Sequence, residues 1–200
     1  MVVAGATQSG KTTTVMKLLA QAAKHFQPAP RRVVLFYNCD QSIYHDMGSS
    51  LRSQGIEVQM EPTRELSEED LQRFASPSYE TLILIDDSTI AAQKSIQLAH
   101  LFTVARHYHV SLVVFLHSIF GGNQANRIIA QNTMYYFLQN SPRMRGQVQM
   151  LGSQMGMRKE LQGAFDRISG TPYSHVFVDL HPTSKINNRV RTNITTTSVV

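Results

Sequence analysis

Short apolar runs alternate along the chain with longer amphipathic segments, an order that predicts repeated strand–helix–strand units and a mainly parallel central sheet. The first long segment has the helical pattern, with apolar residues at Val15, Leu18, Leu19 and Ala22. Runs such as 82–85 and 112–116 are apolar throughout, which is typical of strands covered on both faces. The pattern therefore predicts an α/β fold. We expect strands at 2–5, 33–37, 56–60, 81–85, 111–116, 134–138 and 174–180, an edge strand at 189–194, and helices at 11–25, 42–54, from 67 onward, 90–106, 124–131, 143–155 and 158–168.

The length of 200 residues fits one ordinary domain, and no convincing linker divides the chain. We expect residues 1–200 to form a single domain, with 183–200 as an edge strand and tail. Only four residues precede Gly5, few for a central strand, which suggests a chain truncated at its amino end. The longest apolar runs are strand-sized, so no membrane-spanning helix is expected. The single Cys39 cannot form an internal disulfide, which favours a reducing compartment.

A glycine-rich segment follows the first expected strand and opens the first expected helix. It reads Gly5-Ala6-Thr7-Gln8-Ser9-Gly10-Lys11-Thr12, a complete match to the phosphate-loop pattern G-x-x-x-x-G-K-[ST]. The glycines let the loop curl so that its backbone N–H groups form an anion cradle, which the helix amino terminus completes. We expect Lys11 to reach the β- and γ-phosphates and Thr12 to hold Mg²⁺, with Thr13 at the α-phosphate. The segment therefore predicts nucleotide binding.

A buried strand ends in two carboxylates at Asp86 and Asp87. In parallel α/β sheets this edge is also where phosphate loops lie. Asp86 is expected to hold Mg²⁺ together with Thr12, and Asp87 to orient or deprotonate the attacking water. An ordinary helix cap at Asp87 is the competing interpretation.

The next expected strand ends at His117, whose side chain is a candidate to contact the γ-phosphate or to position water. A polar strand end that faces solvent is the alternative. Fast NTP hydrolysis also uses an arginine finger, often from a neighbouring subunit. We nominate Arg106, at the end of a long helix. Arg127, Arg143 and Arg145 stay open as alternatives, and Tyr44, Phe120 and Tyr135 stay open as contacts of the nucleotide base.

The net charge of +5 lies entirely in the last 60 residues. Residues 1–140 contain 11 basic and 11 acidic side chains, whereas residues 141–200 contain 8 basic and 3 acidic ones. A polyanion partner is one interpretation of this surplus, and a solvated basic surface is the other.

The order of these segments resembles the viral DNA-packaging ATPases of the poxvirus type, in the FtsK/HerA branch of P-loop ATPases. The resemblance rests on 5–12, 33–38, 82–87, the Arg106-His107 pair before 110–120, 173–180 and 189–194. It implies a three-layer, RecA-like (ASCE) ATPase core with ATP and Mg²⁺ as cofactors. It also implies a homo-oligomeric ring, a hexamer, that threads double-stranded DNA into a capsid inside a host cell, with capsid proteins as further partners.

Residue by residue, the resemblance makes Lys11 and Thr12 the Walker A pair and Asp86 the Walker B metal residue. The chain departs from the family pattern at two positions. Asp87 stands where many relatives have Glu, and His117 stands where this branch often has a glutamine. Two other functions stay open at this point: a P-loop kinase acting on a nucleoside or nucleotide, and a nucleotide-binding scaffold or switch with little hydrolysis.

Overall fold

The structure, a computed structural model, describes residues 1–62, 65–86, 95–121 and 123–194. The chain divides into two compact units. The middle unit contains Thr12–Phe115 and Gly122–Asn132, and the terminal unit contains Met1–Lys11, Leu116–Gly121 and Thr133–Val200.

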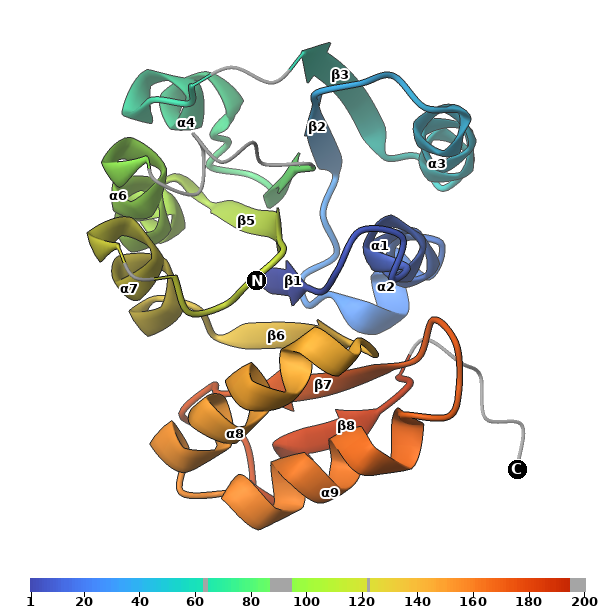
Figure 1. The fold of residues 1–200 in the computed structure, drawn as a ribbon. Helices are drawn as coiled ribbons and strands as arrows, with labels where there is room; N and C mark the ends of the chain where they lie inside the picture. The colour runs from blue at the N-terminus through green and yellow to red at the C-terminus, as the bar shows by residue number, and fades with distance from the viewer. Residues whose placement is uncertain (63–64, 87–94, 122, 195–200) are drawn as a thin grey trace. The chain divides into compact units, whose positions relative to one another are not determined.

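The middle unit is built on four parallel strands in the order β3-β2-β4-β5. The inner strands are buried along nearly their whole length, as their continuous apolar sequences require. Helices α1, α2 and α3 cover one face of these strands, and α4, α6 and α7 cover the other (Figure 1). The elements are α1 (Lys11–Leu19), α2 (Ala22–His25), β2 (Arg32–Tyr37), α3 (Ser42–Ser53), β3 (Glu57–Pro62), α4 (Glu68–Phe74), β4 (Thr81–Ile85), α6 (Ile96–Val104), the 3₁₀ turn η1 (Ala105–Tyr108), β5 (Val110–Leu116, its last residue in the terminal unit) and α7 (Gln124–Gln131).

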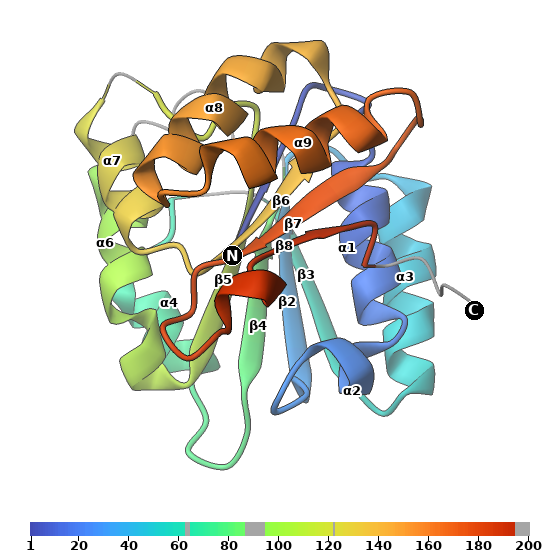
Figure 2. The same ribbon diagram turned by 90° about the horizontal axis from the view of Figure 1, so that it is seen from below.

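The terminal unit contains strands in the order β1-β6-β7-β8. Strand β1 runs parallel to β6, whereas β7 is antiparallel to both β6 and β8. Helices α8 and α9 lie side by side over one face of β6, β7 and β8 (Figure 2). The elements are β1 (Val2–Ala4), β6 (Tyr135–Gln139), the 3₁₀ turn η2 (Pro142–Met144), α8 (Arg145–Gln154), α9 (Arg158–Ile168), β7 (His175–Asp179), the 3₁₀ turn η3 (Ile186–Asn188) and β8 (Val190–Thr192).

The predicted α/β class with mainly parallel strands is confirmed, and the elements follow the predicted order. The expected single helix over 11–25 is wrong, because Gln21 leaves the helical conformation at φ −127° and ψ 48°. The break gives two helices and lets Ala22, 1% exposed, pack into the core. The helix expected over 143–155 begins only at Arg145, because Pro142 opens a separate 3₁₀ turn.

The helix expected over 90–106 is shorter in the part that the structure describes, where α6 ends at Val104 and η1 follows. Residues 90–94 lie outside the described residues. The side chain of Ser95 accepts a hydrogen bond from the Leu98 N–H at 3.1 Å and so caps α6. The expectation of a single domain stays a prediction. No helix in the described parts of the chain is long and apolar enough to cross a membrane.

Candidate nucleotide and metal site

The glycine-rich loop leaves β1 at Gly5 and ends where α1 begins at Lys11. The Gly5 N–H donates to the Leu116 carbonyl at 3.0 Å, which fixes the start of the loop at the end of β5. A Cβ atom at Gly5 would lie 2.5 Å from the Ser9 hydroxyl and 2.6 Å from the Cβ of Gln139. Only glycine fits there. Gly10 has φ +93°, a left-handed conformation that glycine adopts without strain.

The ammonium group of Lys11 lies over the loop that precedes it. Its Nζ donates to the carbonyl oxygens of Gly5 and Ala6, both at 3.0 Å. The positive charge is therefore held at the concave backbone rather than extended into solvent. Thr7, Gln8 and Thr13 are exposed, whereas the rest of the loop is partly or fully buried.

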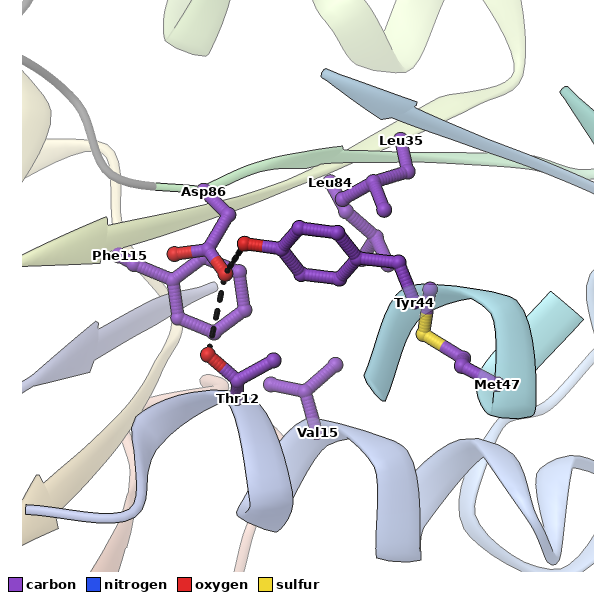
Figure 3. Close-up of a pocket in the computed structure, with 8 residues that line it drawn as sticks. All are labelled: Thr12, Val15, Leu35, Tyr44, Met47, Leu84, Asp86 and Phe115. Carbon is purple, nitrogen blue, oxygen red and sulfur yellow. Dashed lines mark hydrogen bonds between the residues drawn. The ribbon is translucent and has the colours of Figure 1, made fainter. Parts of the chain in front are cut away.

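Asp86 is the first residue after β4, and it is 5% exposed. Its N–H donates to the Phe36 carbonyl at 2.9 Å, which ties the backbone of Asp86 to β2. The Thr12 hydroxyl donates to Asp86 Oδ2 at 3.0 Å (Figure 3). Because Thr12 follows Lys11 directly in the chain, this contact brings the acidic strand end to the end of the phosphate loop.

Sequence reasoning missed the second partner of this carboxylate. The Tyr44 hydroxyl donates to the same oxygen, Asp86 Oδ2, at 2.8 Å, and it accepts from the Gln41 amide at 3.1 Å. Tyr44 is 1% exposed, so its ring cannot contact a nucleotide base, and that interpretation was wrong. The available signal was its helical spacing with Met47 and Leu51, which places all three on the buried face of α3.

Apolar side chains surround the Thr12–Tyr44–Asp86 group. In the close-up the phenol and the threonine hydroxyl both point at the carboxylate (Figure 3). The walls exclude water, which strengthens the hydrogen bonds to the carboxylate and holds its orientation. These walls are formed by Val15, Leu35, Met47, Leu84 and Phe115.

A hydroxyl and a carboxylate oxygen fit a hard cation such as Mg²⁺, which binds proteins through one or two carboxylates and takes its remaining ligands from water and phosphates. Thr12 and Asp86 supply such a pair at the loop. No group of three His, Cys, Asp or Glu side chains suited to a metal occurs among the described residues. Thr12 and Asp86 therefore fit a cation that is also coordinated by a phosphate ligand better than a cation coordinated by protein side chains alone.

The other predicted site residues are placed differently. His117 is exposed, and it directly follows Leu116, whose carbonyl accepts the hydrogen bond from the Gly5 N–H. Its backbone therefore lies at the end of β5, next to the start of the loop. Asp87 lies outside the described residues, and its role stays a prediction. Arg106 lies in η1 before β5, at the edge of the middle unit where Thr81 pairs with Val110. Asp86 follows β4 at the opposite edge, so Arg106 does not lie beside Asp86 within the same chain.

The alternatives to these residues can also be located. Tyr135 begins β6, which runs parallel to β1, so it lies at the strand end away from Gly5 and is not at the loop. Arg145 forms an ion pair with Asp166 at 2.8 Å. Arg127 and Arg143 are exposed, and Phe120 is half-buried.

Comparisons of the sequence with family models and with curated proteins found no match. Solved structures do match. The genome packaging NTPase B204 from Sulfolobus turreted icosahedral virus 2 superposes with TM-scores of 0.51, 0.52 and 0.55 in complexes with ATP-gammaS, AMPPCP and AMP. The fold of this chain is therefore similar to that of B204. The matches cover 96% of this chain and 94% of B204, at 11–13% sequence identity.

The strand directions of this fold account for where the predicted site residues gather. Parallel strands in such folds present their carboxyl ends at one edge, and ligands bind outside that edge. Asp86 follows β4 and contacts Thr12 at the end of the loop, in the middle unit. In the terminal unit, Gly5 follows β1 and Gln139 ends β6 beside it.

Proposed function

We propose that this protein is a magnesium-dependent ATPase that moves double-stranded DNA, as the motor of virus genome packaging inside an infected cell. The observation that carries the proposal is the Thr12–Asp86 contact at 3.0 Å, at the end of a complete phosphate loop. The match to B204 over nearly the whole of both chains supports the packaging role. The order of the motifs supports the FtsK/HerA branch.

In this proposal the loop backbone and Lys11 bind the phosphates of ATP. Water adds to the γ-phosphorus, the bond to the β-phosphate oxygen breaks, and ADP and phosphate leave. The Lys11 ammonium stabilises the charge that develops on the phosphate oxygens. Asp87 and His117 are the proposed groups that orient the water or take its proton. An arginine finger, Arg106 in our assignment, comes from the neighbouring subunit of a ring.

Mg²⁺, when bound, neutralises phosphate charge and fixes the geometry of the γ-phosphate. The chain contributes the Thr12 hydroxyl and the Asp86 carboxylate as its ligands. Tyr44 acts one step further away, because its hydroxyl orients Asp86 without itself being a ligand. Such outer hydrogen bonds commonly tune metal affinity about 10- to 100-fold.

Replacing Tyr44 by Phe keeps the ring in the core and removes only the hydroxyl. We expect the Mg²⁺ concentration for half-maximal hydrolysis to rise about tenfold, since a hydrogen bond to a charged group is lost. The affinity for ATP without Mg²⁺ should change less than about twofold, because the phosphate loop is untouched. A Mg²⁺ titration of ATPase activity measures the first quantity, and equilibrium binding in EDTA measures the second.

Tyr79→Phe is the matched control, because Tyr79 precedes β4 at the edge away from Asp86. It should leave the Mg²⁺ dependence unchanged. An unchanged Mg²⁺ dependence in Tyr44→Phe as well would show that Tyr44 only fills space.

DNA as the substrate is supported by the basic surplus of the last 60 residues. Arg143, Arg158, Lys159 and Arg167 all expose their side chains, the last three on α9. Phosphate contacts by such side chains make binding fall steeply with salt. We therefore propose that these exposed basic side chains contact the DNA backbone in a hexameric ring.

The decisive experiment measures ATP hydrolysis with and without duplex DNA at low salt, and particle size in solution. We expect DNA to stimulate hydrolysis, and the stimulation to fade as salt rises from about 50 to 200 mM. The double variant Arg158→Ala/Arg167→Ala should weaken stimulation more than Lys17→Ala/Lys24→Ala, which removes the same charge from exposed sites elsewhere. Hydrolysis indifferent to DNA at low salt would refute the motor, and transfer of the γ-phosphate to a nucleoside would favour a kinase.

A further inference from the structure

An exposed aromatic side chain lies against the phosphate loop. Tyr173 is 69% exposed. A Cβ atom at Gly10 would be 3.2 Å from Cδ1 of Tyr173 and 3.4 Å from its Cβ, so the tyrosine packs directly on the glycine. The topology explains the contact. Strand β7 begins at His175, which pairs with Gln139 at the carboxyl end of β6. Because β1 runs parallel to β6, the phosphate loop follows β1 at this same edge, and the segment that precedes β7 lies there too.

The segment that carries Tyr173 is held by a dense set of hydrogen bonds. The Asn140 amide donates to the carbonyl oxygens of Ile168, Ser169 and Thr171, at 3.0, 3.1 and 2.9 Å. The Ser174 hydroxyl donates to the Ile168 carbonyl at 3.0 Å and also to that of Thr171. The backbone on the amino side of Tyr173 and the residue that follows it are therefore held in place.

The backbone of Tyr173 is itself in a costly conformation. Its φ of +57° lies in the left-handed region, which a bulky residue rarely adopts. Such conformations persist where the surroundings over-determine them, and they gather at ligand clamps. Here the hydrogen bonds from Asn140 and Ser174 supply that constraint, and the result is an aromatic side chain kept at the loop with most of its surface open.

We propose that the Tyr173 ring stacks on the base of the nucleotide bound at the loop. The inference rests on the proposed nucleotide binding and names the part of the nucleotide that this residue recognises. Gly10 belongs to the backbone cradle of the phosphates, so an aromatic ring seated on it is next to a bound nucleotide. The two other tyrosines considered for this role are excluded by burial (Tyr44) and by position (Tyr135).

A stacked tyrosine ring contacts the flat face of a base and not its hydrogen-bonding edge. Every nucleobase has such a face, so the contact is tolerant of base identity. The ligand class is therefore a nucleoside triphosphate recognised as an aromatic ring joined to a polyphosphate. Inorganic tripolyphosphate carries the same phosphate chain without the base, which makes it the matched probe.

The test compares ATP with tripolyphosphate on the full chain. Tyr173→Ala should raise the Kd for ATP roughly 5- to 100-fold, the range found for loss of one base–aromatic stack. The Kd for tripolyphosphate should stay within about twofold, and Tyr173→Phe should bind ATP like the wild type, because the ring is kept. Calorimetry measures all three.

Each contrary result has a distinct meaning. If Tyr173→Ala weakens the binding of ATP and of tripolyphosphate equally, Tyr173 only supports the loop. If the Kd for ATP does not change, the ring touches no base. Either result overturns the stacking inference but leaves the proposed function standing. Wild-type protein that binds neither ligand overturns the proposed function and the inference with it. Loss of ATP binding in Phe120→Ala but not in Tyr173→Ala assigns the base to Phe120 instead.

A fluorescence reporter provides a second reading, because the chain contains no tryptophan. In Tyr173→Trp the indole becomes the only one, and stacking predicts that ATP quenches its emission while tripolyphosphate does not. Tyr135→Trp, at the other end of β6, is the matched control and should respond to neither ligand. Equal responses of Tyr173→Trp to ATP and tripolyphosphate would contradict stacking.

Discussion

Lys11→Ala is expected to abolish ATP hydrolysis, with a loss of at least about a hundredfold in rate and roughly 10- to 100-fold in ATP affinity. The ammonium group is the one formal charge of the loop, and charge-assisted hydrogen bonds to phosphate are the strongest polar contacts that the loop can make. The variant also removes the two hydrogen bonds that hold the carbonyls of Gly5 and Ala6. Rates are measured by phosphate release, and affinity by titration with a non-hydrolysable analogue.

Lys17→Ala is the control for this variant. It lies on the same helix, with the same charge and an exposed side chain, but six residues after Lys11. It should hydrolyse ATP like the wild type. If Lys11→Ala bound ATP as tightly as the wild type, the assignment of the nucleotide site would be wrong, and the motor proposal would be wrong as well.

Asp86→Asn should be nearly as damaging, but its effect should depend on Mg²⁺. The amide keeps the shape of the side chain and an oxygen that can accept from Thr12 and Tyr44, which separates the loss of charge from the loss of packing. We expect hydrolysis to fall roughly 100- to 1,000-fold and the half-saturating Mg²⁺ concentration to rise at least about tenfold. ATP affinity in EDTA should be close to that of the wild type.

The matched control is Asp46→Asn, an exposed carboxylate on the outer side of α3. A Mg²⁺ titration of hydrolysis compares the two variants, and thermal unfolding confirms that both fold. If Asp86→Asn kept the wild-type Mg²⁺ dependence, the metal ligand would have to be another residue.

The local pattern of apolar and polar residues was enough to predict the strands and most of the helices. The reason is that the period of this pattern is set by whether one or both faces of an element are buried. The continuous apolar run before Asp86 is an example, and all five residues of β4 are buried. Pattern failed at Gln21, where the apolar spacing continues into Ala22 although the backbone turns. The apolar spacing alone cannot show such a break, because the order of residues is the same whether or not the backbone turns at Gln21.

The candidate site also has parts that the sequence predicts and a part that it does not. The phosphate loop is contiguous, so its chemistry can be read from eight residues in order. The pairing of Thr12 with Asp86 was also predictable, because the ends of parallel strands meet at one edge. The role of Tyr44 was not, because it depends on where a helix 42 residues away from Asp86 places one hydroxyl.

By itself, the sequence determined the α/β class, the phosphate loop and the carboxylate that meets Thr12, since each follows from contiguous residues or from strand direction. Only the tertiary structure decided that Tyr44 belongs to the buried carboxylate and that Tyr173 lies on Gly10. These two facts depend on distances between segments far apart in the chain. No local pattern encodes such distances, because they arise only when the helices and strands pack against one another.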